Sequence, residues 1–75
     1  MINLTVKLFA TLQIGRFEIR DEQFPDGTTV HDVMQKHGLT KEQVLLMLIN
    51  GRHGDYGTVL ADGDTVALFP PIGGG

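Results

Sequence analysis

Residues 2–9, with the sequence INLTVKLF, alternate between apolar and polar side chains. A period of two is typical of a β-strand with one buried face, so we expect a strand from Met1 to Phe9. Phe9 falls on the otherwise polar face of this strand. The apolar face is formed by Ile2, Leu4, Val6 and Leu8.

A second alternating segment runs from Arg16 to Phe24, after a connection that ends at Gly15. Phe17 and Ile19 share one face of this segment, and charged side chains share the other. We expect a second strand here, paired with the first as a hairpin. Its charged face is formed by Glu18, Arg20 and Glu22.

Residues 25–27, Pro-Asp-Gly, are a turn signal, and a helix is expected directly after them. Thr29 can cap this helix, and Asp32 can complete a capping box. The helix is expected to end at Gly38, which can adopt the left-handed conformation. A second capping box at residues 40–43 predicts a further short helical turn. One face of the main helix carries Val30, Val33, Met34 and His37.

The rest of the chain predicts two more strands. Residues 44–49 are rich in aliphatic side chains and predict a well-covered strand, and Asn50-Gly51 predicts a hairpin turn after it. Residues 52–58 are expected to form an irregular loop. Residues 65–69 predict the final strand, which Pro70-Pro71 ends because proline cannot donate a ladder hydrogen bond.

This order of elements predicts an α+β fold, a roll in which one main helix packs across a mixed sheet of four to five strands. The chain has 75 residues, so one domain is expected. We expect this domain to span residues 1–69 and residues 70–75 to form a flexible C-terminal tail.

The composition argues against several functional classes. The chain has no cysteine and no serine, so it lacks the two commonest nucleophiles of acyl-transfer enzymes. A formal net charge of −3 gives no electrostatic basis for binding nucleic acid. No apolar run approaches the roughly 20 residues of a membrane helix, and the start lacks the pattern of a signal peptide. We therefore expect a cytoplasmic protein without a nucleic-acid or membrane partner.

The end of the chain, Ile72-Gly73-Gly74-Gly75, is poor structural material, because glycine loses more backbone entropy on ordering than any other residue. Its advantage is thinness, since a tail without Cβ atoms can enter a narrow cleft. From Pro70 to Gly75 the reach is roughly 20 Å, at about 3.3–3.6 Å per residue. The pattern favours a terminus that presents the Gly75 carboxylate to the active site of another protein.

Such a carboxylate needs activation before it can react. A partner that uses ATP could adenylate it, and a sulfur nucleophile could then displace AMP and leave a thiocarboxylate. These steps need no catalytic residue, metal or bound cofactor in the carrier. We therefore predict a non-catalytic carrier with its acyl site at Gly75, and clearance for the tail from Gly73 and Gly74.

The sequence resembles the MoaD/ThiS family of ubiquitin-like sulfur carriers over essentially its whole length. The resemblance rests on residues 2–10, 26–30, 49–51 and 60–68, and closes with FPPIGG at 69–74. This last segment is most similar to the small subunit of molybdopterin synthase. The resemblance implies a β-grasp fold, activation by a ubiquitin-activating-type adenylyltransferase, and sulfur delivery to the synthase large subunit in molybdopterin biosynthesis.

A docking surface is also expected, because a tail alone gives little affinity after the cost of ordering it. The alternative is that these residues are scattered surface hydrophobes, which need no explanation. The predicted partner-binding residues are Phe9, Ala67, Phe69, Pro70, Pro71 and Ile72.

Other polar residues do not form a convincing site. His31 and His37 would lie about 240° apart round a helix, on different faces. Asp62 and Asp64 fall on a turn, where carboxylates commonly bind backbone N–H groups. The sequence therefore predicts no metal site. Three lysines are expected to be solvated surface charges: Lys7, Lys36 and Lys41.

Several functions remain open at this stage. The activated Gly75 could pass to a lysine amine, as in a protein modifier, or the domain could be an interaction module with an inert tail. A sulfur carrier could also serve thiamin, cysteine, tRNA thiolation or a tungsten cofactor. We expect the free chain to be a monomer.

Overall fold

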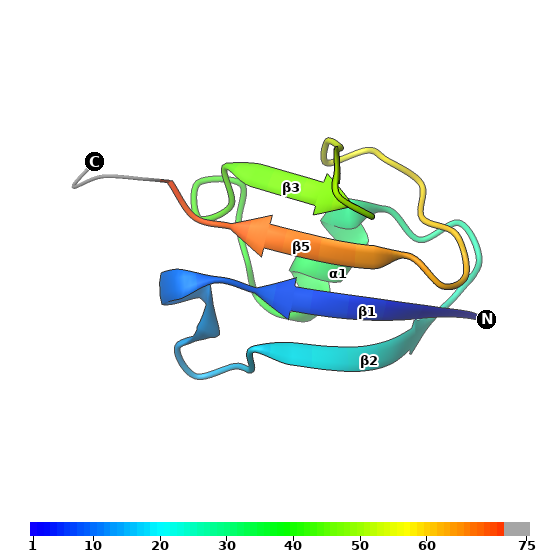
Figure 1. Ribbon diagram of the computed structural model, residues 1–75, viewed down its shortest axis with the longest axis horizontal. Helices are drawn as coiled ribbons and strands as arrows, with labels where there is room; N and C mark the ends of the chain where they lie inside the picture. Colours follow the sequence, from blue (N-terminus) through cyan, green and yellow to red (C-terminus); the bar gives the residue numbers. More distant parts are fainter. Residues whose placement is uncertain (72–75) are drawn as a thin grey trace.

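The computed structural model describes residues 1–71. Five strands form one sheet in the order β2-β1-β5-β3-β4 (Figure 1). The strands β1 and β5 lie side by side in its middle and run parallel, whereas the other neighbouring pairs are antiparallel. The predicted mixed sheet is confirmed. The strands are β1 (Ile2–Leu8), β2 (Ile19–Phe24), β3 (Leu46–Ile49), β4 (Arg52–His53) and β5 (Thr65–Phe69).

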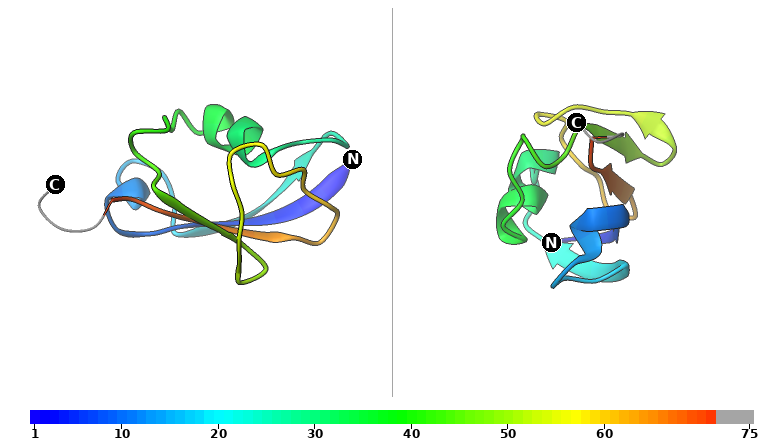
Figure 2. Two further views of the ribbon diagram at one scale, coloured as in Figure 1. Left: turned by 90° about the horizontal axis from the view of Figure 1, so that it is seen from above. Right: turned by 90° about the vertical axis from the view of Figure 1, so that its left-hand side faces the viewer.

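The helix α1 (Val30–Lys36) lies across one face of the sheet, as both views in Figure 2 show. Alternate side chains of β1 and β5 point to this face and are buried beneath the helix, as the sequence predicts. Within residues 1–71 no helix covers the opposite face. The core consists of Ile2, Leu4, Val6, Leu8, Leu12, Phe24, Val30, Val33, Met34, Leu39, Val44, Met47, Leu60, Val66 and Leu68.

The predicted capping box of α1 is confirmed. The Thr29 backbone N–H donates to Asp32 Oδ2 at 2.9 Å, and the Asp32 backbone N–H donates to Thr29 Oγ1 at 3.2 Å. Two otherwise unpaired donors at the start of the helix are thereby satisfied. At its other end Gly38 adopts a φ of 69°, the left-handed conformation expected there.

The second strand differs from its prediction. A short 3-10 helix, η1 (Ala10–Gln13), precedes it, and β2 begins only at Ile19. The two faces of β2 are also the reverse of those predicted. Ile19 is 56% exposed, whereas Glu22 pairs with Leu4 in the register and so faces the helix. His37 Nε2 lies 2.6 Å from Glu22 Oε1, and Lys36 Nζ lies 3.4 Å from Oε2. These partners from the end of α1 allow a carboxylate to replace an apolar side chain at this position.

The second half of the chain follows its prediction with smaller differences. Residues 40–43 form the predicted single helical turn, in which the Val44 backbone N–H donates to the Thr40 carbonyl at 3.2 Å and Gln43 Oε1 accepts from the Thr40 backbone N–H at 2.9 Å. The strand after it begins at Leu46, two residues later than predicted. Asn50 and Gly51 both have positive φ, 53° and 81°, and form the predicted hairpin turn. The segment expected to be a loop then begins with the short strand β4.

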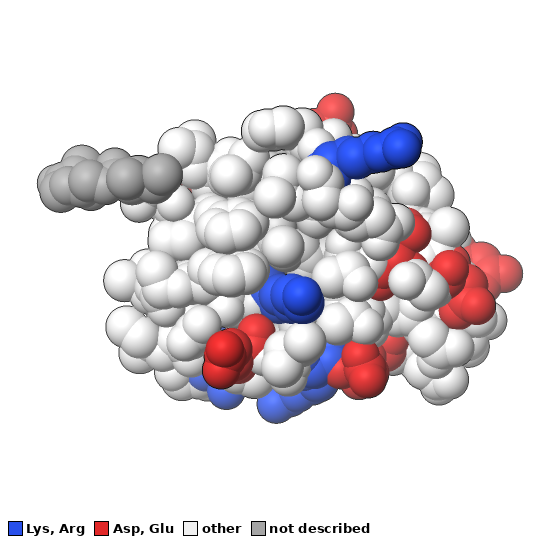
Figure 3. All heavy atoms as spheres, in the orientation of Figure 1, with Lys and Arg blue, Asp and Glu red and all other residues white. Residues whose placement is uncertain are grey.

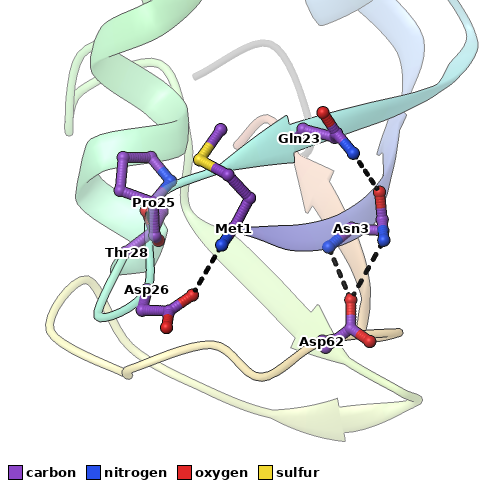
Figure 4. Close-up of polar contacts among 7 residues, drawn as sticks. All are labelled: Met1, Asn3, Gln23, Pro25, Asp26, Thr28 and Asp62. Carbon is purple, nitrogen blue, oxygen red and sulfur yellow. Dashed lines mark hydrogen bonds and ion pairs between the residues drawn. The ribbon is translucent and has the colours of Figure 1, made fainter.

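Polar contacts fasten the start of β1 to the turn before β5 (Figure 4). Asp62 Oδ1 accepts from the Asn3 backbone N–H at 2.7 Å, and the Gly63 N–H donates to the Asn3 carbonyl at 2.7 Å. Gln23 reaches the Asn3 side chain from β2, and the N-terminal ammonium pairs with Asp26 at 3.2 Å. Asp64 Oδ2 in turn accepts from the Ala61 backbone N–H at 2.8 Å. Both aspartates of this turn thus bind backbone N–H groups, as predicted.

The capping box gives the stability of the fold a specific acid dependence. The hydrogen bond from the Thr29 backbone N–H, aided by one with its side chain, holds the pKa of Asp32 below its ordinary value of 3.8. In the unfolded chain this carboxyl therefore takes up its proton first. Its contribution to stability is present above pH 3.8 and is lost as the pH falls below 3.8 through the lower folded-state pKa.

We therefore expect Asp32→Asn to show a smaller decrease in unfolding free energy over this acid range than the wild type. Urea unfolding at a series of pH values measures the difference. Parallel pH profiles for the two proteins would show that the capping carboxylate does not contribute in this way.

Candidate functional site

The candidate site lies where β5 ends. This strand occupies the position between β1 and β3, so side chains from three strands surround the point at which the chain leaves the sheet. Pro70 is partly buried and Pro71 is exposed. The predicted tail residues Ile72, Gly73, Gly74 and Gly75 lie outside the described residues.

Two phenylalanines predicted for partner binding are brought together here. The rings of Phe9 and Phe69 stack with their centroids 4.2 Å apart and an angle of 13° between their planes. The Phe9 backbone N–H donates to the Leu68 carbonyl at 3.2 Å, which continues the pairing of β1 and β5. Both rings are only partly buried, so the stack is a surface feature and not part of the core.

An apolar groove of about 370 Å³ adjoins this stack. Ala10 lines this groove and has a φ of 51°. This left-handed conformation costs a non-glycine residue on the order of 1–2 kcal/mol. This conformation turns the chain sharply after Phe9. The groove is lined by Phe9, Ala10, Leu45, Leu46, Phe69, Pro70 and Pro71.

The contribution of Leu45 and of β3 to this groove was not predicted from the sequence. Leu45 is 65% exposed, although it belongs to the run predicted as a well-covered strand. Leu46 pairs with Phe69, and Leu48 pairs with Ala67, so both lie on the face away from the helix. Because residues 44–48 are all aliphatic or Met, no polar alternation marks which of them face outward.

The uncovered face of the sheet is apolar toward the groove and polar toward the start of β1. Ala67 lies between Leu48 of β3 and Lys7 of β1, and Lys7 in turn pairs with Ile19 of β2. Figure 3 views this face and shows a broad white surface on the side where β5 ends, while most of the red atoms lie toward the opposite end and one red group lies below the central blue atoms. The predicted strip of Phe9, Ala67 and Phe69 therefore belongs to a larger surface.

Other polar residues are not assembled into a site. His37 contacts Glu22, while Asp64 accepts from the Asn50 side chain at 2.8 Å. Residues 1–71 contain no group of three histidine, cysteine, aspartate or glutamate side chains that could hold a metal ion. Nor does any helix among them have the length and hydrophobicity needed to cross a membrane.

Comparisons with known proteins identify the family. A model of the ThiS family matches residues 6–75. The chain belongs to the ThiS family. The resemblance seen in the sequence is thereby confirmed, and with it the sulfur-carrier or ubiquitin-like modifier character of the fold. Among curated proteins, no sequence matches the chain.

Solved structures agree with the ThiS assignment. Small archaeal modifier protein 1 of Haloferax volcanii is 26% identical with a TM-score of 0.75, and the match covers 96% of this chain and 100% of that protein. A Pyrococcus furiosus protein described as a putative molybdopterin converting factor, subunit 1, is 27% identical with a TM-score of 0.74, over 96% and 100% of the two chains. These likenesses confirm the predicted β-grasp fold.

One similar structure includes a partner. It is the complex of subunits 1 and 2 of the molybdopterin-converting factor from Helicobacter pylori, with 26% identity and a TM-score of 0.66. The match covers 99% of this chain and 100% of that one. A protein similar to this ThiS-family chain is therefore known in association with a second subunit.

The stack and the core beneath it should differ in their contribution to stability. We expect Phe9→Ala to cost about 1–2 kcal/mol, because the ring is partly exposed and loses mainly its aromatic contact. Leu8→Ala, one residue away but fully buried, should cost about 3–5 kcal/mol. Urea unfolding of both variants measures the difference. Equal costs would show that Phe9 serves the core.

Proposed function

We propose that this chain is a sulfur carrier whose Gly75 carboxylate is adenylated by a partner enzyme and converted into a thiocarboxylate. The observation that carries the proposal is the apolar groove at the base of the tail. It offers a docking surface at the point from which the chain leads to Gly75. The ThiS match, which extends to residue 75, supports the same reading.

The proposed chemistry has two steps at the terminal carboxyl group. A Gly75 oxygen attacks the α-phosphorus of ATP, and pyrophosphate leaves, which gives a mixed anhydride. A hydrosulfide equivalent supplied by the partner then adds to the carbonyl carbon, and AMP leaves with the bonding electron pair. The resulting thiocarboxylate donates its sulfur to an acceptor.

In this scheme the chain supplies position and the partner supplies catalysis. Phe9, Ala67 and Phe69 contact the partner, and Pro70-Pro71 directs the tail away from the sheet. Gly73 and Gly74 give clearance in the active site, while Ile72 anchors the tail in the channel. We assign no catalytic residue and no bound cofactor to the chain itself.

We further propose molybdopterin biosynthesis as the pathway, with the synthase large subunit as the sulfur acceptor. The Phe69-Pro70-Pro71 segment and the similarity to two molybdopterin-converting factor subunits support this choice. Both proposed partners, the adenylating enzyme and the synthase large subunit, would have to dock against the groove before the tail could reach their active sites.

A second candidate is a protein modifier conjugated through Gly75 to lysine amines. The similarity to small archaeal modifier protein 1 favours it. Both functions begin with adenylation and differ in the final nucleophile. Conjugates in cell extract that disappear when Gly75 is deleted would favour the modifier over the carrier.

The terminal carboxylate can be tested directly. We expect intact-mass analysis of the untagged protein, after incubation with ATP, the adenylating enzyme and sulfide, to show one oxygen replaced by sulfur. Fragmentation should place the sulfur on Gly75. A variant with alanine appended after Gly75 should stay folded and remain unmodified. Sulfur acceptance by that variant would contradict the proposal.

The groove can be tested separately with Phe69→Asp. A carboxylate in the middle of an apolar interface would be desolvated without a partner, so we expect affinity for the adenylating enzyme to fall about tenfold or more. Calorimetric titration measures the affinity. Val59→Asp is the matched control, because Val59 is 65% exposed and does not line the groove. Equal affinities for the two variants would remove the groove from the interface.

A further inference from the structure

Lys7 occupies an unusual position on the uncovered face of the sheet. Its neighbours across β1 are Ile19 on one side and Ala67 on the other. Among the described residues of the five strands, Lys7 is the one Lys or Arg on this face, because the register places Arg20 and Arg52 on the helix side. In Figure 3, one group of blue atoms lies at the centre of this face, with red atoms below it on either side.

The charge of Lys7 has no partner within residues 1–71. Its side chain is partly buried, yet no carboxylate in this part of the chain lies within ion-pair distance. Lys7 and Glu18 line the same pocket without forming an ion pair, and Asp21 Oδ1 accepts a hydrogen bond from the Thr5 hydroxyl at 2.7 Å. The ammonium group therefore depends on water for its solvation.

Docking on this face would remove that water. An ammonium group that is buried without a counter-charge is strongly unfavourable, whereas its aliphatic stem can pack against apolar neighbours. A purely apolar partner surface would accordingly be rejected at this position. A partner with an aspartate or glutamate opposite Lys7 would be accepted, and a cation there would be repelled.

We propose that Lys7 is a specificity residue of the docking surface and pairs with a carboxylate of the adenylating enzyme. The proposal rests on the proposed function. Adenylation is the first step for both a carrier and a modifier, so this enzyme is the partner that either function requires. Lys7 would thereby discriminate the adenylating enzyme from proteins that present only an apolar surface.

Binding of the full-length chain to the adenylating enzyme, without ATP, tests the pairing. We expect Lys7→Glu to weaken binding at least about thirtyfold and Lys7→Met about tenfold, with the salt dependence reduced in Lys7→Met. Lys41→Glu is the matched control. Lys41 lies over the Tyr56 ring, in the connection between α1 and β3, and its substitution by Glu changes the charge by the same amount. It should bind like the wild type.

Carbodiimide cross-linking locates the partner group. This reagent joins an amine to a carboxylate that lies against it, so we expect a cross-linked peptide that contains Lys7 and an aspartate or glutamate of the enzyme. The same peptide should be absent with Lys7→Met. Unchanged binding by Lys7→Glu, an equal loss with Lys41→Glu, or impairment only with the sulfur acceptor would each overturn the inference.

The proposed function and this inference fail in different ways. If Lys7→Glu binds normally while Gly75 still becomes a thiocarboxylate and Phe69→Asp still loses affinity, only the role of Lys7 is wrong. If Gly75 never acquires sulfur in the wild type, the carrier function itself is wrong.

Discussion

The parallel pairing of β1 with β5 is the constraint on which the rest of the structure depends. It joins the first and last strands, so that β2 pairs with the outer edge of β1 and β3 with the outer edge of β5. Val6 then lies beside Val66 and Leu8 beside Leu68, and α1 closes over these side chains. The same pairing brings Phe9 to Phe69 and fixes where the tail begins.

This arrangement gives the two faces of one sheet different surroundings. Side chains on one face meet the helix and form the core, while those on the other face remain available for contact. Because successive side chains of a strand point to opposite faces, one segment contributes to both, as Leu8 and Phe9 show in consecutive positions. The chain can therefore keep an apolar outer surface without interrupting its core, which is modest because a chain this short buries only about 60% of its unfolded surface.

Much of this could be predicted from the sequence because the signals are local. Alternation in residues 2–9, the capping box at Thr29 and the Asn50-Gly51 turn each specify their own structure within a few residues. Glu22 was placed on the wrong face because its position depends on the register with β1 and on His37, fifteen residues away in the chain. Leu46 was missed since its outward orientation is set only by its pairing with Phe69.

The parallel pair also has a mechanical consequence. Because β1 and β5 run in the same direction, the start of one strand and the end of the other lie at opposite ends of the sheet. Tension applied to the tail while the N-terminal end is held would shear these strands past each other. Their hydrogen bonds run across the strands, so such a load falls on several of them together instead of opening them one by one. The fold is therefore built to resist a pull along the direction in which its C-terminal end leaves the sheet.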